Sequence, residues 1–174
     1  MALIQLDLVL GSGDQLLTFD DETNLDWLNL TATANKSYDD VMAGFGGFIG
    51  PYGFAYGDAS QVGTLLVHAG ITKGISEPIF QPSPNDMLNH VGIQMIQSLM
   101  NGRFFIAGTP HSKVQTRGII KPPVPSPDPN ASLNAFITSL NLIVPVNSHV
   151  DILPSTRPGL RMPNLSSYLC RLHG

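Results

Sequence analysis

Two helix-start signals constrain the fold of the first 70 residues more than any other feature of this chain. Ser37 is followed by Asp40, and Asp58 is followed by Gln61, each at the spacing of a capping box. In that arrangement the first side chain accepts a hydrogen bond from the backbone amide of the third helical residue. The side chain of that third residue in turn accepts one from the backbone amide of the first. The two pairs predict helices that begin at residues 38 and 59. Glycine readily adopts the left-handed conformation that ends many helices, so we expect the helices to end at Gly44, Gly46 and Gly47 and at Gly70.

Both predicted helices carry apolar residues at helical spacing, so each should bury one side against a core. These residues are Tyr38, Val41, Met42 and Phe45 in the first helix and Val62, Leu65, Leu66 and Ala69 in the second.

The segment before the helices has the pattern of a β-hairpin. β-prone runs at 16–19 and 25–30 flank the cluster 20–24, whose Asp and Asn side chains favour a turn. Leu25 and Trp27 alternate along the second run, so we expect their face to be the core face. A short strand at 54–56 is predicted between the two helices.

Motifs in this segment resemble exported bacterial surface proteins, many of which carry a PEP-CTERM sorting tail. The pattern is D-x-x-T-x-L-x-W-L-x-L-T-x-T, then S-Y-x-x-V, G-F-x-Y and H-A-G-I, with a closing P-N-x-x-S-Y-L. The resemblance covers roughly the first 70 residues and the last dozen. The matching residues are Asp20, Thr23, Leu25, Trp27, Leu28, Leu30, Thr31, Thr33, Ser37, Tyr38, Val41, Gly53, Phe54, Tyr56, His68 to Ile71 and Pro163 to Arg171.

The pattern is more distantly similar to C-type-lectin-like domains of bacterial and phage surface proteins. That similarity implies an opening hairpin, two helices, a long loop region and a closing strand that pairs with the first. It implies a binding or structural role. It does not point to any reaction, because the same fold can host many functions. We therefore expect an α+β fold: a single C-type-lectin-like domain, residues 1–174, with a small antiparallel sheet, two to three helices and long proline-rich loops. Its expected parts are core strands and helices (1–71), a helix and loop region (72–163) and a closing strand (164–174).

The rest of the chain is more irregular. We expect a first strand within 2–10, a loop at 72–84, a third helix capped by Asn85 or Asp86 and ended by Asn101 and Gly102, and a strand at 104–107. A short helix at 132–142, an edge strand at 143–146, a proline-rich loop at 151–163 and a closing strand at 168–172 follow. The expected buried residues of the third helix are Leu88, Val91, Met95 and Leu99, and those of the short helix are Leu133, Phe136, Ile137 and Leu140.

Prolines crowd the segment from Lys121 to Pro129, which should be an extended, polyproline-like chain. Two interpretations stay open. The segment is a solvated surface loop, or it is an arm that lies across a neighbouring subunit, where a stiff chain loses less entropy on docking. The candidate contact residues of such an arm are Pro122, Pro123, Pro125 and Pro127.

Composition narrows the class of protein. Hydrophobic residues make up 43% of the 174 residues, which indicates a globular chain. Charged residues make up 13%, about half the usual share, and a weakly charged surface favours association with protein neighbours in an oligomer or lattice. Nine Lys plus Arg residues and a net charge of −4 argue against nucleic acid. No stretch is long enough to span a membrane.

Targeting signals bear on localisation. The first residues lack a basic region and a long apolar core, so they do not read as a secretory signal, and no sorting tail follows the closing strand. We expect either that targeting segments were removed, or that the domain acts where export is unnecessary, as in a virion protein released by lysis.

Few residues in the sequence suggest a catalytic or metal-binding role. The lone cysteine, Cys170, is expected to be a buried apolar residue of the last strand. Five scattered histidines show no metal-ligand spacing, and His68 is expected to have a structural role near the end of its helix. Neither a G-x-S-x-G elbow nor a phosphate loop occurs. The five histidines are His68, His90, His111, His149 and His173.

Two sets of candidate binding residues stay open. Asp20, Asp21 and Glu22 are weak calcium candidates, because calcium binds carboxylate oxygens, although a turn explains them as well. Trp27 and Phe54 could line a sugar or protein contact together with Tyr52 and Tyr56, but Trp27 is more typical of a core position. No catalytic residues and no cofactor other than calcium are expected.

These observations predict a non-enzymatic structural or binding protein of a surface assembly. The preferred form is a phage decoration, cement or fibre-type component on the virion surface. The alternative is an exported bacterial adhesion or carbohydrate-binding domain, extracellular or on the cell surface, with a glycan as its ligand.

Overall fold

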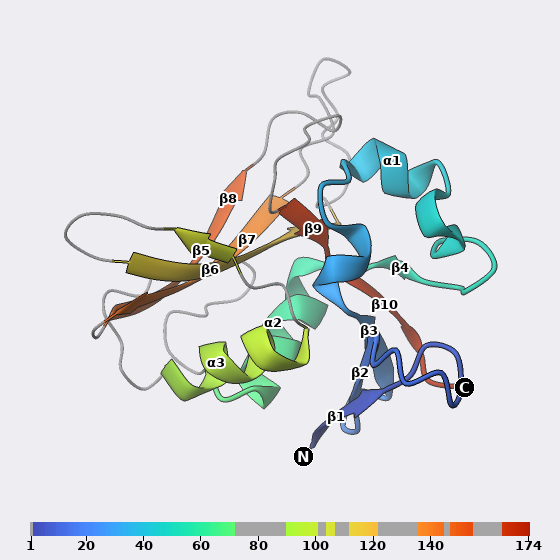
Figure 1. Ribbon diagram of the computed structural model, residues 1–174, viewed down its shortest axis with the longest axis horizontal. Helices are drawn as coiled ribbons and strands as arrows, with labels where there is room; N and C mark the ends of the chain where they lie inside the picture. Colours follow the sequence, from blue (N-terminus) through green and yellow to red (C-terminus); the bar gives the residue numbers. More distant parts are fainter. Residues whose placement is uncertain are drawn as a thin grey trace.

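The computed structural model describes residues 2–71, 90–100, 104–106, 112–121, 136–144, 147–154 and 165–174. These residues form a mixed α+β structure with three α-helices, one antiparallel sheet and a second sheet that is antiparallel except for one short parallel pair (Figure 1). The α-helices are α1 (Tyr38–Met42), α2 (Ala59–His68) and α3 (His90–Leu99), and short 3₁₀ turns are η1 (Leu30–Thr33) and η2 (Phe45–Gly47). The strands are β1 (Leu3–Leu6), β2 (Leu17–Asp20), β3 (Leu25–Leu28), β4 (Ala55–Tyr56), β5 (Phe104–Ile106), β6 (Ser112–Ile120), β7 (Phe136–Val144), β8 (Asn147–Pro154), β9 (Leu165–Ser167) and β10 (Leu169–Leu172).

The first sheet has the order β1-β2-β3-β10-β4, and all its neighbours are antiparallel. The predicted hairpin is confirmed as β2 and β3, and the short strand at 54–56 is confirmed as β4. The closing strand is also confirmed, but its expected pairing with the first strand is wrong. β10 lies between β3 and β4, with Cys170 opposite Trp27, so two strands separate it from β1.

The second sheet has the order β5-β6-β7-β8, and β9 runs parallel to β6. The strand at 104–107 is confirmed as β5. The helix expected at 132–142 is wrong, because 136–144 form β7, paired along its whole length with β6. The edge strand expected at 143–146 is also wrong for Ile143 and Val144, which end β7 between two strands. The loop expected at 151–163 is wrong for residues 151–154, which form the last part of β8.

Strand β3, in the middle of the first sheet, is buried on both of its faces. On one face Trp27 packs with residues of α2 and α3, and on the other Leu28 packs with Val41 of α1 and with Phe54. Figure 1 shows α2 and α3 side by side on one side of the hairpin, with α1 beyond its far end. The predicted core position of Trp27 is confirmed, since none of its surface is exposed. The predicted core face, which carries Trp27 and the partly buried Leu25, is confirmed, and Leu28 shows that the opposite face of β3 is buried as well.

The two capping boxes and the glycine ends are confirmed. Ser37 with Asp40 and Asp58 with Gln61 form both reciprocal hydrogen bonds, and Gly44 and Gly70 have φ angles of 98° and 92°. All four predicted apolar residues of α2 are buried. In α1 the prediction is wrong for Met42 and Phe45, which are exposed; the helix ends after five residues, so Phe45 belongs to η2.

The expected buried face of α3 is wrong for Val91 and Met95, although Leu99 is partly buried against the core. Val91 and Met95 are exposed, whereas Ile93, Ile96 and Met100 are buried. Gly92 explains this orientation, because a Cβ atom there would lie 2.7 Å from the backbone oxygen of Ala69. The missing side chain lets α3 approach the end of α2 closely and turns the isoleucines toward the sheet.

Several predictions lie outside the described residues. They are the loop at 72–84, the cap of the third helix at Asn85 or Asp86, Leu88, the helix end at Asn101 and Gly102, the extended segment 122–129, Leu133, the end of the expected edge strand at 145–146 and the rest of the expected loop at 155–163. Among the helices that the structure does describe, none combines the length and apolar character needed to cross a bilayer.

Candidate functional site

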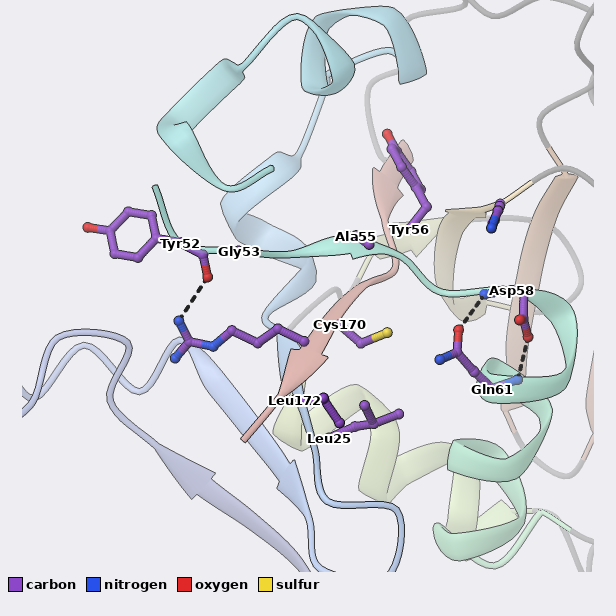
Figure 2. Close-up of a pocket in the computed structure, with 11 residues that line it drawn as sticks. Leu25, Tyr52, Gly53, Ala55, Tyr56, Asp58, Gln61, Cys170 and Leu172 are labelled. Atoms are coloured by element: carbon purple, nitrogen blue, oxygen red, sulfur yellow. Dashed lines mark hydrogen bonds between the residues drawn. The ribbon is translucent and has the colours of Figure 1, made fainter. Parts of the chain in front are cut away.

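An open groove of about 710 Å³ lies beside β4, the edge strand of the first sheet (Figure 2). Its floor comes from β4 and β10, and its ends come from the start of α2 and from Lys121, which follows β6. Backbone contacts join these parts, since the Lys121 amide donates to the Gly57 carbonyl and the Gly57 amide to the Tyr168 carbonyl. The groove is therefore shaped by segments that are far apart in sequence.

The polar side chains at the α2 end serve the helix start. The Asp58 carboxylate accepts a hydrogen bond from the Gln61 amide at 2.8 Å, and the Gln61 side chain accepts one from the Asp58 amide at 3.0 Å. Figure 2 shows both dashed contacts at one side of the groove. These side chains satisfy backbone donors that a helix start leaves open. They line the groove as parts of the scaffold.

One of the two cations that line the groove, Arg171, is held by the sheet behind it. Its Nε donates to the Asp26 carboxylate at 3.2 Å, and its Nη1 donates to the Tyr52 carbonyl at 3.0 Å. The guanidinium also lies 4.8 Å from the Phe54 ring centre, a cation–π distance. Arg171 thus fastens the loop before β4 to the adjacent strands β3 and β10.

Cys170 lies in the groove floor but is almost fully buried. Burial, aided by the negative charge of Asp58, raises the pKa of its thiol to about 11. Near neutral pH the sulfur therefore stays protonated, and a thiol is a poor nucleophile compared with a thiolate. The predicted role of a buried residue in the last strand is confirmed.

The structure brings the two predicted tyrosines to the groove with different roles. Tyr56 is a core residue: its hydroxyl lies 2.9 Å from the Ser167 hydroxyl, its ring stacks on Tyr38 at 4.6 Å, and burial raises its pKa. Tyr52 is half-buried at the outer end of the groove, and Figure 2 shows its ring directed away from Cys170 and Asp58. Tyr52 is the better candidate for a contact with a partner.

The other candidates are placed elsewhere or lie beyond the described residues. Pro122, Pro123, Pro125 and Pro127 fall outside them. Asp20 is buried against His68 at 2.9 Å, the Glu22 carboxylate lies 3.0 Å from the other nitrogen of His68, and Asp21 accepts the Ala2 amide at 2.7 Å. Within the part of the chain that is described, no three His, Cys, Asp or Glu side chains are grouped to hold a metal ion.

The sequence reading did not identify Arg171, Lys121 or Asp26 as parts of one site. Asp26 carried one signal, an acidic residue inside an apolar strand, where a charge requires a partner. The partner appears only from the register, which sets Arg171 directly opposite Asp26 across β3 and β10. The two residues are 145 positions apart, so no local pattern connects them.

Comparisons with protein-family models, with curated proteins and with solved structures found no match.

Proposed function

We propose that this protein is a non-enzymatic structural or binding component of a surface assembly, in its preferred form a decoration, cement or fibre-type protein of a phage particle. The proposed fold within the α+β class is C-type-lectin-like, and the proposed relatives are the exported surface proteins with PEP-CTERM-type tails. The weakly charged composition, with 13% charged residues, supports a protein that keeps permanent neighbours.

One observation supports this role most directly: apart from Lys121, the charged and acidic groups that line the groove already serve the fold. Asp58 and Gln61 cap α2, Arg171 bonds Asp26 and Tyr52, and the Cys170 thiol is held protonated. General acid–base or nucleophilic catalysis needs a group that can exchange a proton or attack at the site. A groove in which Asp58, Gln61 and Arg171 are committed to structure offers a shaped surface for contact.

The virion proposal is tested on particles produced from the source genome. Particles are purified on a density gradient, and the protein is quantified in each fraction by mass spectrometry. We expect it to band with the capsid or tail proteins in multiple copies. Recovery of the protein only in the soluble fractions contradicts the proposal. The absence of capsid or tail genes near the gene that encodes this protein also contradicts it.

The groove's part in attachment is tested with two matched substitutions. Ala55→Arg places a long charged side chain in the groove, and Ala43→Arg makes the same change at an exposed position after α1. Because hot-spot contacts dominate binding, we expect Ala55→Arg to weaken rebinding to depleted particles about tenfold or more. Ala43→Arg should rebind as the wild type does. Equal rebinding of both variants contradicts a role for the groove.

The second candidate is an exported adhesion or carbohydrate-binding domain. The half-buried Tyr52 and the exposed Lys121 at the groove favour it, since an amphipathic ring and a cation suit a glycan ligand. A glycan array probed with and without calcium tests this alternative. Binding that calcium strengthens and Tyr52→Ala abolishes supports it, whereas an array without signal in both conditions contradicts it.

A further inference from the structure

Within the described part of the chain, β1 is an edge strand of the first sheet with no strand on its outer side. It is the outermost strand of the order β1-β2-β3-β10-β4, and Figure 1 places it at the margin of the molecule beside the N-terminus. Its sequence is Leu-Ile-Gln-Leu. Edge strands are commonly protected against pairing by lysine, proline, inward-pointing charge or a bulge, and this strand has none of these residues. Ile4 is 42% exposed, and Gln5 is exposed beside it.

The backbone groups of β1 that face away from the sheet can be identified. The Asp21 amide donates to the Ala2 carbonyl, so Ala2 and Asp21 form a hydrogen-bonded pair in the antiparallel ladder. Hydrogen-bonded pairs alternate with non-bonded ones. Ile4 therefore bonds β2, whereas the amides and carbonyls of Leu3 and Gln5 point away from β2, where no described residue pairs with them.

This edge is complementary to itself. An antiparallel copy related by a twofold axis at Ile4 sets Leu3 of each strand opposite Gln5 of the other. All four outward amides then find carbonyl partners, and Ile4 faces the Ile4 of the second copy. Leu3 and Gln5 are two residues apart and so point to the same side of their strand. The paired side chains of the two copies therefore lie on the same face of the joined sheet.

We propose that β1 pairs with β1 of a second copy of this chain, which joins two five-stranded sheets into one continuous sheet. A partner copy fits better than a charged ligand because residues 3–6 carry no charge and their outward groups are backbone amides and carbonyls. The contact is short, so the dimer is weak in dilute solution, at the low end of interface sizes, and strengthens when copies are concentrated. This inference rests on the proposed assembly role and names one of its contacts.

Disulfide trapping tests the register directly. Across the twofold axis the Ile4 residues form a non-bonded pair, with Cα atoms about 4.5 Å apart, a distance within disulfide reach. Ile4→Cys should therefore form a covalent dimer under mild oxidation. Val67→Cys, at a position on α2 that is 41% exposed, is the matched control and should stay monomeric. The natural Cys170 is buried and does not interfere.

A second pair of variants tests the hydrogen bonds. Gln5→Pro removes an outward amide and leaves the bonds to β2, whereas Gln5→Ala keeps the amide. Far-UV circular dichroism checks that each variant is folded. In sedimentation velocity at rising concentration, we expect wild type and Gln5→Ala to dimerise and Gln5→Pro to remain monomeric, and Gln5→Pro should also suppress trapping through Ile4→Cys.

Two results overturn the inference: Ile4→Cys traps no faster than Val67→Cys, or Gln5→Pro dimerises like the wild type. Either result assigns the edge to a different occupant or to none. The proposed function fails separately, through the particle experiment. A monomer that still bands with particles contradicts only the β1 pairing, and a dimer absent from particles contradicts only the virion role.

Discussion

The Nδ1 atom of His68 lies 2.9 Å from a carboxylate oxygen of Asp20, whose side chain is 1% exposed. The contact ties the last residue of α2 to the last residue of β2. On the other face of the sheet, Asp26 is equally buried and lies 2.7 Å from Nδ1 of His173. One hairpin therefore holds two buried carboxylates, and a histidine from a distant segment partners each of them.

Removing the partner of Asp20 should destabilise the fold. His68→Ala leaves a buried carboxylate without its imidazole, at a cost of about 3 kcal/mol. Glu22→Ala removes the other contact of the same imidazole, but the Glu22 side chain is 48% exposed, so the expected cost is below about 1 kcal/mol. Urea unfolding followed by Trp27 fluorescence measures both values. Equal costs for the two variants would show that burial of Asp20 is not the cause.

The ring of Trp27 depends on the absence of a side chain at Gly57. A Cβ atom there would lie 2.8 Å from the ring, well inside contact distance. Gly57→Ala should therefore destabilise the protein by about 1–3 kcal/mol and alter the emission of its only tryptophan. Gly50→Ala is the control, because its Cβ meets no atom within 4 Å and should change stability by less than about 1 kcal/mol. An unchanged spectrum and stability in Gly57→Ala would contradict this packing.

The Cys170 thiol should be unreactive in the folded protein. At pH 8 we expect its reaction with a disulfide reagent to be at least about 100-fold slower than that of an exposed cysteine at Val67→Cys, because the reaction requires local opening. Folding raises the pKa of this thiol from 9.0 to about 11, so its contribution to stability is complete below pH 9 and is lost as the pH rises toward 11. Rapid labelling of the native wild type at pH 8 would contradict this assignment.

The loop between β1 and β2 should depend on the charge of Asp14. Burial would raise the pKa of Asp14, but hydrogen bonds from the backbone of Leu16, Leu8 and Val9 and from Ser12 outweigh it and lower the pKa to about 2. The carboxylate therefore supports the loop above about pH 4 and loses this effect as the pH falls through about 2. The loop presents Leu10, which is 99% exposed, to solvent.

Amide hydrogen exchange tests the Asp14 prediction. In Asp14→Asn the amides that bond this carboxylate, those of Leu8, Val9 and Leu16, should exchange faster than in the wild type. Asp39→Asn, an equal loss of charge in the first turn of α1, should leave those amides unchanged. Equal exchange in both variants would show that the loop is held by other contacts.

Local features were predictable from sequence because the interactions that create them span a few residues. The hairpin, both capping boxes, the glycine helix ends and the buried stripe of α2 each depend on neighbours within about one helical turn or one β-turn. Features that depend on a distant partner were predicted poorly. The apolar spacing at 136–140 fits a helix and a strand alike, and the pairing of β7 with β6 and β8 selected the strand.

By itself, the sequence determined where the first helices begin and end, that β2 and β3 form a hairpin and that Trp27 is buried. Only the tertiary structure decided that β10 enters between β3 and β4, that α3 turns Ile93 and Ile96 inward, and that Asp26 meets Arg171. The reason is that strand order and helix rotation follow from which surfaces exclude water together. That choice depends on contacts between segments that are distant in sequence, as in the Asp26–Arg171 pair, whose members are 145 positions apart.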